Sequence, residues 1–183
     1  MILDITGYSE DKPFLLIDVD GVVNVTNRSQ NTKTYKIFKA AGYPIRIRHE
    51  MPDWLFRLSG HFHLVWCTMW DDLANTELSP ELDLPSLPYI PCWESQETVV
   101  EWNGHALHTK IPLIADHMKE RPFAFVDDWL RSGDMMWAAG RNKAVAPTKF
   151  LPIDPRMGLL EHHVNKLVGW AIQLKGGEEV DEG

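Results

Sequence analysis

A short apolar run leads directly into two carboxylates near the start of the chain. Phe14 to Ile17 are all apolar, Asp18 and Asp20 follow two positions apart, and Gly21 comes next. An apolar run of this length, bounded by turn residues, predicts a buried strand of the kind found in parallel sheets. Open sheets of this class bind ligands at the carboxyl ends of their strands, where these carboxylates fall. Asp and Gly are also common turn residues, and this stretch alone supports both interpretations equally.

Predicted strands and helices alternate along the chain. Apolar runs predict strands at about 13–19, 63–67, 123–126 and 145–153. Apolar periodicity or helix-start residues predict helices at 51–58, 111–120 and 159–174. Because strands that alternate with helices form βαβ units, we expect an α/β fold with a doubly wound, mainly parallel sheet.

Length and composition favour a single globular domain. The chain has 183 residues, of which 44% are hydrophobic and 24% charged. We expect the domain over 1–175 and a disordered acidic tail over 176–183. No apolar run approaches the roughly 18 residues that cross a membrane, and we expect no signal peptide and a cytoplasmic protein. Cys67 and Cys92 adjoin apolar runs, which favours reduced core thiols, although a disulfide between them stays open.

The segment after the first strand predicts a β-hairpin with one basic face. Its second arm alternates Ile with Arg46 and Arg48, after a turn at 40–42. Residues 24–49 include Lys and Arg but no Asp or Glu, although the chain carries a net charge of −8 that argues against a general nucleic-acid coat. A solvated charged face explains this pattern as well as a functional flap does. In the functional interpretation, a flap over about 24–50 contacts an anionic substrate through the two arginines.

Three predicted strands end in polar side chains that suit catalysis. Asp18 and Asp20 follow the first strand, Thr68 follows the second, and Asp127 with Asp128 follow the strand at 123–126. In a parallel sheet these strand ends share one edge, so we expect the side chains to lie close together. Mg²⁺ prefers oxygen ligands and relieves repulsion between carboxylates. The sequence therefore predicts a Mg²⁺ site at this edge.

The same residue types can hydrolyse a phosphate ester. One carboxylate can attack phosphorus as a covalent nucleophile, and a second can protonate the leaving oxygen and then activate water. A hydroxyl such as Thr68 and an ammonium such as Lys110 can hold the phosphoryl oxygens. Lys110 also fits an ordinary surface lysine, because a single residue makes up its signal. The histidines, among them His105 and His108, lack metal-ligand pairing with the carboxylates, and we expect them at the surface or in the core.

The order of these residues resembles the four motifs of the haloacid dehalogenase (HAD) superfamily of phosphohydrolases. Asp18-Val19-Asp20-Gly21-Val22 is similar to its first motif, Thr68 to its second, Lys110 to its third and Asp127-Asp128 to its fourth. A response-regulator receiver combines similar side chains, but its acidic pair precedes its phosphorylated Asp, whereas here the DxD comes first. The stretch 66–75 and the residues at 146–148 and 158–159 further resemble the small cap-less HAD domains of bacterial and phage RNA-repair proteins.

The resemblance implies a role for each matching residue. Asp18 would be the nucleophile that forms a phosphoaspartate and would also bind Mg²⁺. Asp20 would be the general acid and base, and its backbone carbonyl would bind the metal. Thr68 and Lys110 would bind the phosphoryl group, with Met69 beside them in the substrate site.

Asp127 would complete the metal site, and Asp128 would help directly or through water. Which of the two contacts the metal stays open.

The resemblance also bears on the substrate. Only 50 positions separate Asp18 from Thr68, and the predicted hairpin lies among them, which leaves no room for a large cap domain. An open site with a basic flap suits a phosphorylated nucleotide or an RNA or DNA end, and Trp70 suits either base stacking or core packing. A HAD-like module that binds nucleic acid or a phosphorylated partner without turnover is the alternative.

Overall fold

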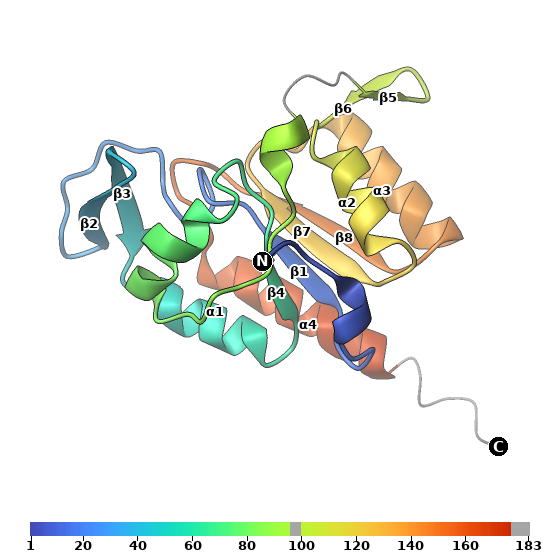
Figure 1. The fold of residues 1–183 in the computed structure, drawn as a ribbon, viewed down its shortest axis with the longest axis horizontal. Coiled ribbons are helices and arrows are strands. Elements are labelled where there is room, and N and C mark those ends of the chain that lie inside the picture. The colour runs from blue at the N-terminus through green and yellow to red at the C-terminus, as the bar shows by residue number, and fades with distance from the viewer. Residues whose placement is uncertain (96–99, 177–183) are drawn as a thin grey trace.

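A four-stranded parallel sheet of order β4-β1-β7-β8 forms the centre of the computed structural model, which describes residues 1–95 and 100–176 (Figure 1). Its strands are β1 (Phe14–Ile17), β4 (His63–Trp66), β7 (Phe123–Asp127) and β8 (Thr148–Pro152). Ile17 pairs with Trp66 on one side and with Val126 on the other, so the three strands end at one edge. The predicted α/β fold with a parallel sheet is confirmed.

Helices cover both faces of this sheet. Figure 1 shows α1 (Met51–Ser59) and α4 (Glu161–Gly176) on one side, and α2 (Ile111–Met118) and α3 (Ser132–Ala144) on the other. Successive strand residues point to opposite faces. Leu15 and Ile17 join the core with α1 and α4, whereas Phe14 and Leu16 join the core with α2 and α3. A strand buried on both faces reads as a continuous apolar run, which explains the pattern in the sequence.

Two hairpins extend from this body. The first pairs β2 (Tyr35–Ala40) with β3 (Tyr43–Arg48), as predicted, and turns through Ala41 and Gly42 at φ of 48° and 84°. The second pairs β5 (Val100–Trp102) with β6 (His105–Leu107) and turns through an Asn-Gly pair with positive φ at both residues. Positive φ at both central residues matches the right-handed twist of the flanking strands.

The helix α3 has no counterpart among the sequence-based predictions. Its buried residues are Gly133, Asp134, Ala138 and Arg141, so it lacks an apolar stripe. The guanidinium of Arg141 donates to the carbonyl of Arg121 at 3.2 Å, and a Cβ at Gly133 would lie 2.9 Å from the carbonyl oxygen of Ala106. Small residues and buried polar bonds hold this helix in place, and apolar periodicity does not detect such a helix.

Short helical turns complete the described chain: η1 (Ile5–Gly7), η2 (Ala74–Leu78), η3 (Pro80–Leu82) and η4 (Cys92–Ser95). Gly176 belongs to α4 rather than to the expected tail, and 177–183 lie outside the described residues. The Sγ atoms of Cys67 and Cys92 lie 3.6 Å apart in the core, so no disulfide joins them. Within the described residues, no helix has the length and apolar character needed to cross a bilayer.

Candidate active site

A cavity of about 600 Å³ lies at the carboxyl edge of the sheet. The loops after β1, β4 and β7 form its walls together with β6 and the loop that leads from β6 to α2. Six of the site residues predicted from the sequence line this cavity: Asp18, Asp20, Met69, Lys110, Asp127 and Asp128. Thr68 is 1% exposed directly after β4 and does not line the cavity, so its contact with a phosphoryl group stays a prediction.

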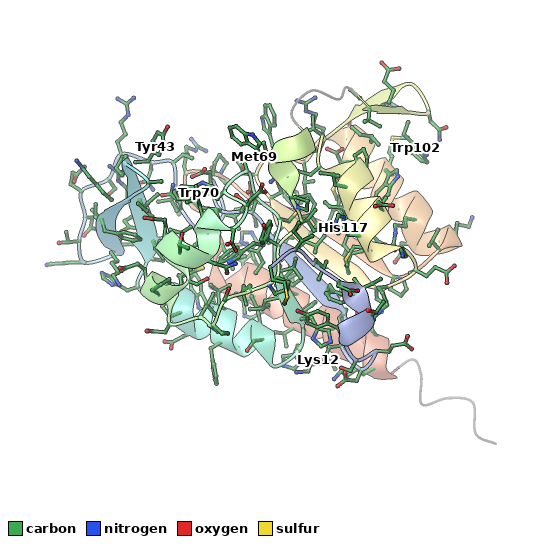
Figure 2. All side chains as sticks on the ribbon, viewed as in Figure 1. Lys12, Tyr43, Met69, Trp70, Trp102 and His117 are labelled. Carbon is green, nitrogen blue, oxygen red and sulfur yellow. The ribbon has the colours of Figure 1, made fainter. Side chains whose placement is uncertain are left out.

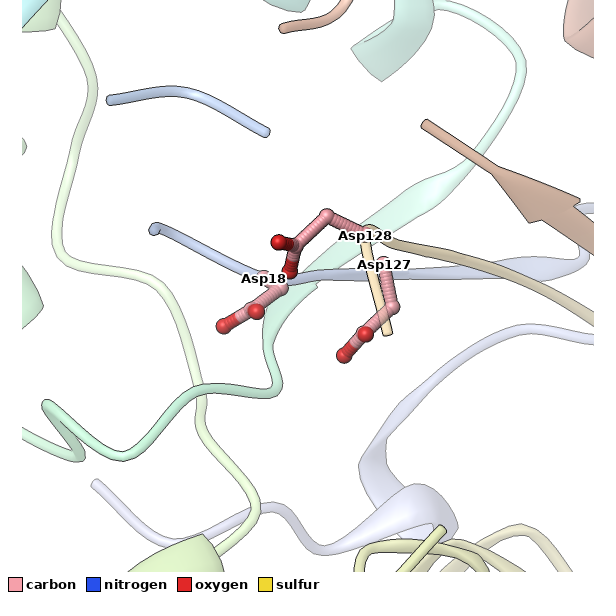
Figure 3. A group of neighbouring side chains, drawn as sticks. All are labelled: Asp18, Asp127 and Asp128. Carbon is pink, nitrogen blue, oxygen red and sulfur yellow. The ribbon is translucent and has the colours of Figure 1, made fainter. Parts of the chain in front are cut away.

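Three carboxylates converge in this cavity. Asp18, Asp127 and Asp128 each offer one oxygen, and these oxygens all lie within 4.8 Å of one another (Figure 3). Asp18 follows the last residue of β1, and Asp127 is the last residue of β7, the strand beside it. Three carboxylates at this spacing repel one another, and nearby positive charge relieves that repulsion. An all-oxygen ligand set of this kind fits Mg²⁺.

Lys110 joins two of these carboxylates. Its Nζ lies 3.0 Å from Asp18 Oδ1 and 2.8 Å from Asp127 Oδ2, and the residue is 2% exposed. Burial alone would lower the pKa of the Lys110 ammonium, but Asp18 and Asp127 outweigh burial and hold this pKa above its usual range. The interpretation of Lys110 as an ordinary surface lysine is therefore wrong.

The pKa values of the two carboxylates beside Lys110 shift in opposite directions. Burial raises the pKa of Asp18 to about 6, although Lys110 opposes this rise. Burial would also raise the pKa of Asp127, but His108 and Lys110 hold that pKa well below its usual range. The backbone N–H of Trp129 donates to Asp127 Oδ1 at 2.7 Å. Asp127 is thus a fixed anion, whereas Asp18 has fewer groups that stabilise its charge.

His108 is a residue of this site that the sequence interpretation missed. Its Nδ1 accepts the backbone N–H of Lys110 at 3.1 Å, which places the proton of the neutral ring on Nε2. Nε2 lies 3.5 Å from Asp127 Oδ1. The backbone N–H of His108 donates to Asp134 Oδ1 at 2.7 Å, which connects this loop to the first turn of α3. The only signal in the sequence is its position two residues before Lys110.

Asp20 lies apart from the three clustered carboxylates. The side-chain amide of Asn24 donates to its Oδ1 at 2.7 Å, and Trp70 Nε1 donates to its Oδ2 at 2.8 Å. Asn24 also accepts the backbone N–H of Arg46 at 2.9 Å, so the same amide connects Asp20 to β3. Trp70 packs against the core, which is one of the two roles predicted for it, and it also donates a hydrogen bond to the carboxylate of Asp20. The sequence does not predict this second contact.

Arg46 and Arg48 do not line the cavity. Arg46 Nε donates to the carbonyl of Ser29 at 2.9 Å, and Arg48 Nε donates to the carbonyl of Met157 at 3.2 Å. Both guanidinium groups therefore bind backbone carbonyls of neighbouring loops. A contact of Arg46 and Arg48 with substrate stays a prediction. Arg131, which the sequence interpretation did not include, does line the cavity, with its guanidinium 5.0 Å from the ring centroid of Trp129.

No protein-family model and no curated protein sequence matches the chain. Among solved structures it is similar to Fcp1, an essential RNA polymerase II CTD phosphatase, with a TM-score of 0.43 and 15% identity over 95% of this chain and 55% of that chain. It is also similar to a fission yeast Fcp1 variant bound to beryllium fluoride, with a TM-score of 0.39 and 13% identity over 92% of this chain and 52% of that chain. The chain spans about half the length of each of these proteins.

Proposed function

We propose that the protein is a Mg²⁺-dependent phosphatase that hydrolyses a phosphate monoester through a phosphoaspartate on Asp18. The observation that carries this proposal is the convergence of Asp18, Asp127 and Asp128 at one cavity, with the Lys110 ammonium 3.0 Å from the Asp18 carboxylate. This arrangement combines a nucleophile, an oxygen ligand set for a divalent cation and a buried positive charge. The order of the motifs along the chain, which resembles the HAD superfamily, supports the same chemistry.

In the proposed reaction, an oxygen of Asp18 attacks phosphorus, the bond from phosphorus to the leaving oxygen breaks, and Asp20 gives that oxygen a proton. Water then attacks the phosphoaspartate, Asp20 takes a proton from the water, and phosphate leaves as the Asp18 carboxylate is restored. Lys110 offsets the negative charge on the phosphoryl oxygens. Mg²⁺, when bound by the three carboxylates, stabilises the same charge.

The test is hydrolysis of a generic aryl phosphate with and without Mg²⁺. We expect Asp18→Asn to abolish phosphate release, because an amide of the same shape is not a nucleophile. Asp116→Asn makes the same chemical change at an exposed position of α2 and is the matched control. Activity that survives Asp18→Asn would remove Asp18 as the nucleophile. Tight binding of phosphorylated ligands with no hydrolysis would instead favour the alternative, a HAD-like module that binds its ligand without turnover.

The substrate of this reaction is a proposal as well. A nucleotide or a polynucleotide end, as in the cap-less domains of RNA-repair proteins, suits an open site of this size. A screen that compares 3′- and 5′-phosphorylated oligonucleotides with free nucleotides tests this expectation directly.

A further inference from the structure

A second cavity adjoins the candidate active site at Asp20. It has a volume of about 430 Å³, and Asp20 and Met69 line both cavities. Five further side chains line most of the rest of it: Tyr43, Pro44, Trp70, Leu73 and Trp93. We call it the aromatic cavity, after its tyrosine and its two tryptophans. Its volume lies within the range of roughly 300–1,000 Å³ that is typical of small-molecule sites.

Two of the three aromatic side chains of this cavity are exposed, and Trp70, which packs against the core, is half-buried. Tyr43 is 67% exposed and Trp93 is 64% exposed. The backbone N–H of Trp93 donates to Asp71 Oδ1 at 3.4 Å, in the turn that also contains Trp70. Figure 2 shows Tyr43 on the first hairpin, with Trp70 and Met69 between this hairpin and the sheet. Exposed aromatic rings that gather around one hollow are a feature of ligand-binding surfaces.

The hairpin is connected directly to η2, the helical turn that follows the cavity residue Leu73. The backbone N–H of Ala41, at the hairpin turn, donates to Glu77 Oε2 at 3.2 Å. Asn24 connects the other end of the same hairpin to Asp20, as described above. These contacts position the hairpin next to Asp20, the carboxylate that the aromatic cavity shares with the candidate active site.

Charge restricts what the aromatic cavity can bind. Asp20 is the only carboxylate among the described residues that line it, and none of them is Lys, Arg or His. A second phosphate would find no cation there. Flat uncharged rings suit these walls, because aromatic side chains bind unpaired bases by stacking.

We propose that the aromatic cavity binds the nucleoside part of a phosphorylated nucleotide, with the ester oxygen at Asp20. The inference rests on the proposed function, in which Asp20 protonates the leaving oxygen. A leaving group that starts at Asp20 and points away from Asp18 enters the aromatic cavity. A phenyl group would leave most of this volume empty, whereas a nucleoside reaches the tyrosine and both tryptophans. The nucleotide is free or lies at the end of a strand.

The experiment compares kcat/KM in Mg²⁺ for adenosine 3′-monophosphate, adenosine 5′-monophosphate and ribose 5-phosphate, which lacks the base. We expect at least one nucleotide to exceed ribose 5-phosphate by about tenfold or more, since one stacked base contributes this much. Trp93→Ala should reduce this ratio toward one. Phe56→Ala, which removes a 78% exposed ring from α1, is the matched control and should leave the ratio unchanged. A terminally phosphorylated oligonucleotide distinguishes a strand end from a free nucleotide.

Two different failures are distinguishable. Equal kcat/KM for all three compounds, or a preference for a phosphotyrosine peptide over every nucleotide, would overturn the nucleoside site but leave the phosphatase intact. No hydrolysis of any phosphate would remove the proposed function. In that case, saturation-transfer NMR with adenosine still tests the cavity. A signal that Trp93→Ala weakens supports the nucleoside site, and no signal overturns it.

Discussion

Gly21 lies against the carboxylate of Asp128. Its φ is 79°, a conformation that side chains other than glycine rarely adopt. A Cβ at this position would lie 2.3 Å from the carboxyl carbon of Asp128. Two features therefore require a glycine at position 21. The turn needs its positive φ, and the side chain of Asp128, from the loop after β7, occupies the space that a Cβ would fill. This close approach is what lets Asp128 reach the other two carboxylates.

Substitution of Gly21 tests this residue-scale argument. Gly21→Ala should displace Asp128, weaken Mg²⁺ activation by about tenfold and lower the free energy of unfolding by ~1–2 kcal/mol from backbone strain. Activity against Mg²⁺ concentration and urea unfolding measure the two effects. Gly169→Ala is the control, because nothing lies within 4 Å of a Cβ built there in α4. An unchanged Mg²⁺ dependence in Gly21→Ala would contradict the argument.

At the scale of elements, α4 begins at a histidine contact that depends on protonation. His163 Nδ1 accepts the backbone N–H of Leu160 at 3.1 Å, and Leu160 accepts the backbone N–H of His163 at 2.9 Å. This reciprocal pair satisfies an amide that has no partner inside the helix. Burial, together with His162 and Lys166, lowers the pKa of His163 to about 4 from its usual 6.5. The neutral ring is therefore the form that supports the helix start.

The free energy of unfolding should respond to pH in a defined direction. Because the pKa of His163 is lower in the folded chain, the unfolded chain binds the proton first as pH falls. The contribution of His163 is fully present above pH 6.5 and is lost as pH falls toward 4. We expect His163→Asn, whose side chain retains an acceptor, to lose less stability than wild type between about pH 7 and pH 5. Identical pH profiles from chemical denaturation would contradict this prediction.

At the scale of the whole molecule, the strand order decides which side chains meet. The order β4-β1-β7 puts the ends of these strands side by side, although the chain between β1 and β7 is long. The start of α2 then brings Lys110 between Asp18 and Asp127. Only the assembled sheet brings together the residues of the proposed cation site, so a cation that binds there must favour the folded state.

Mg²⁺ should therefore raise the melting temperature. A cation at 100 times its Kd that binds only the folded state adds ~2.7 kcal/mol to the free energy of unfolding. For a chain of this size that corresponds to roughly 5–10 °C in Tm. Asp128→Asn should reduce the shift, and Na⁺ at equal ionic strength is the salt control. A shift of the same size in Asp128→Asn would show that the cation binds elsewhere.

Local pattern predicts most of the sheet. The run from Phe14 to Ile17 and the later apolar runs identify the buried strands, because a strand covered on both faces tolerates little else. The alternation of Ile and Arg in the second arm and the turn at 40–42 predict the first hairpin. Both the turn and the two-residue period of the side chains are properties of neighbouring residues in the sequence. The carboxylates at the strand ends follow, because parallel strands end at one edge.

Tertiary contacts determine the features that the sequence does not predict, because these contacts join residues that lie far apart along the chain. The helix α3 is held by Arg141 and small residues rather than by an apolar stripe. The burial of Lys110 and the contact of His108 with Asp127 depend on the loop from β6 to α2, which meets β7 at its carboxyl end. The sequence by itself determines which residues are available for the proposed chemistry. The fold alone decides which of them meet, because burial and charge act between neighbours in space.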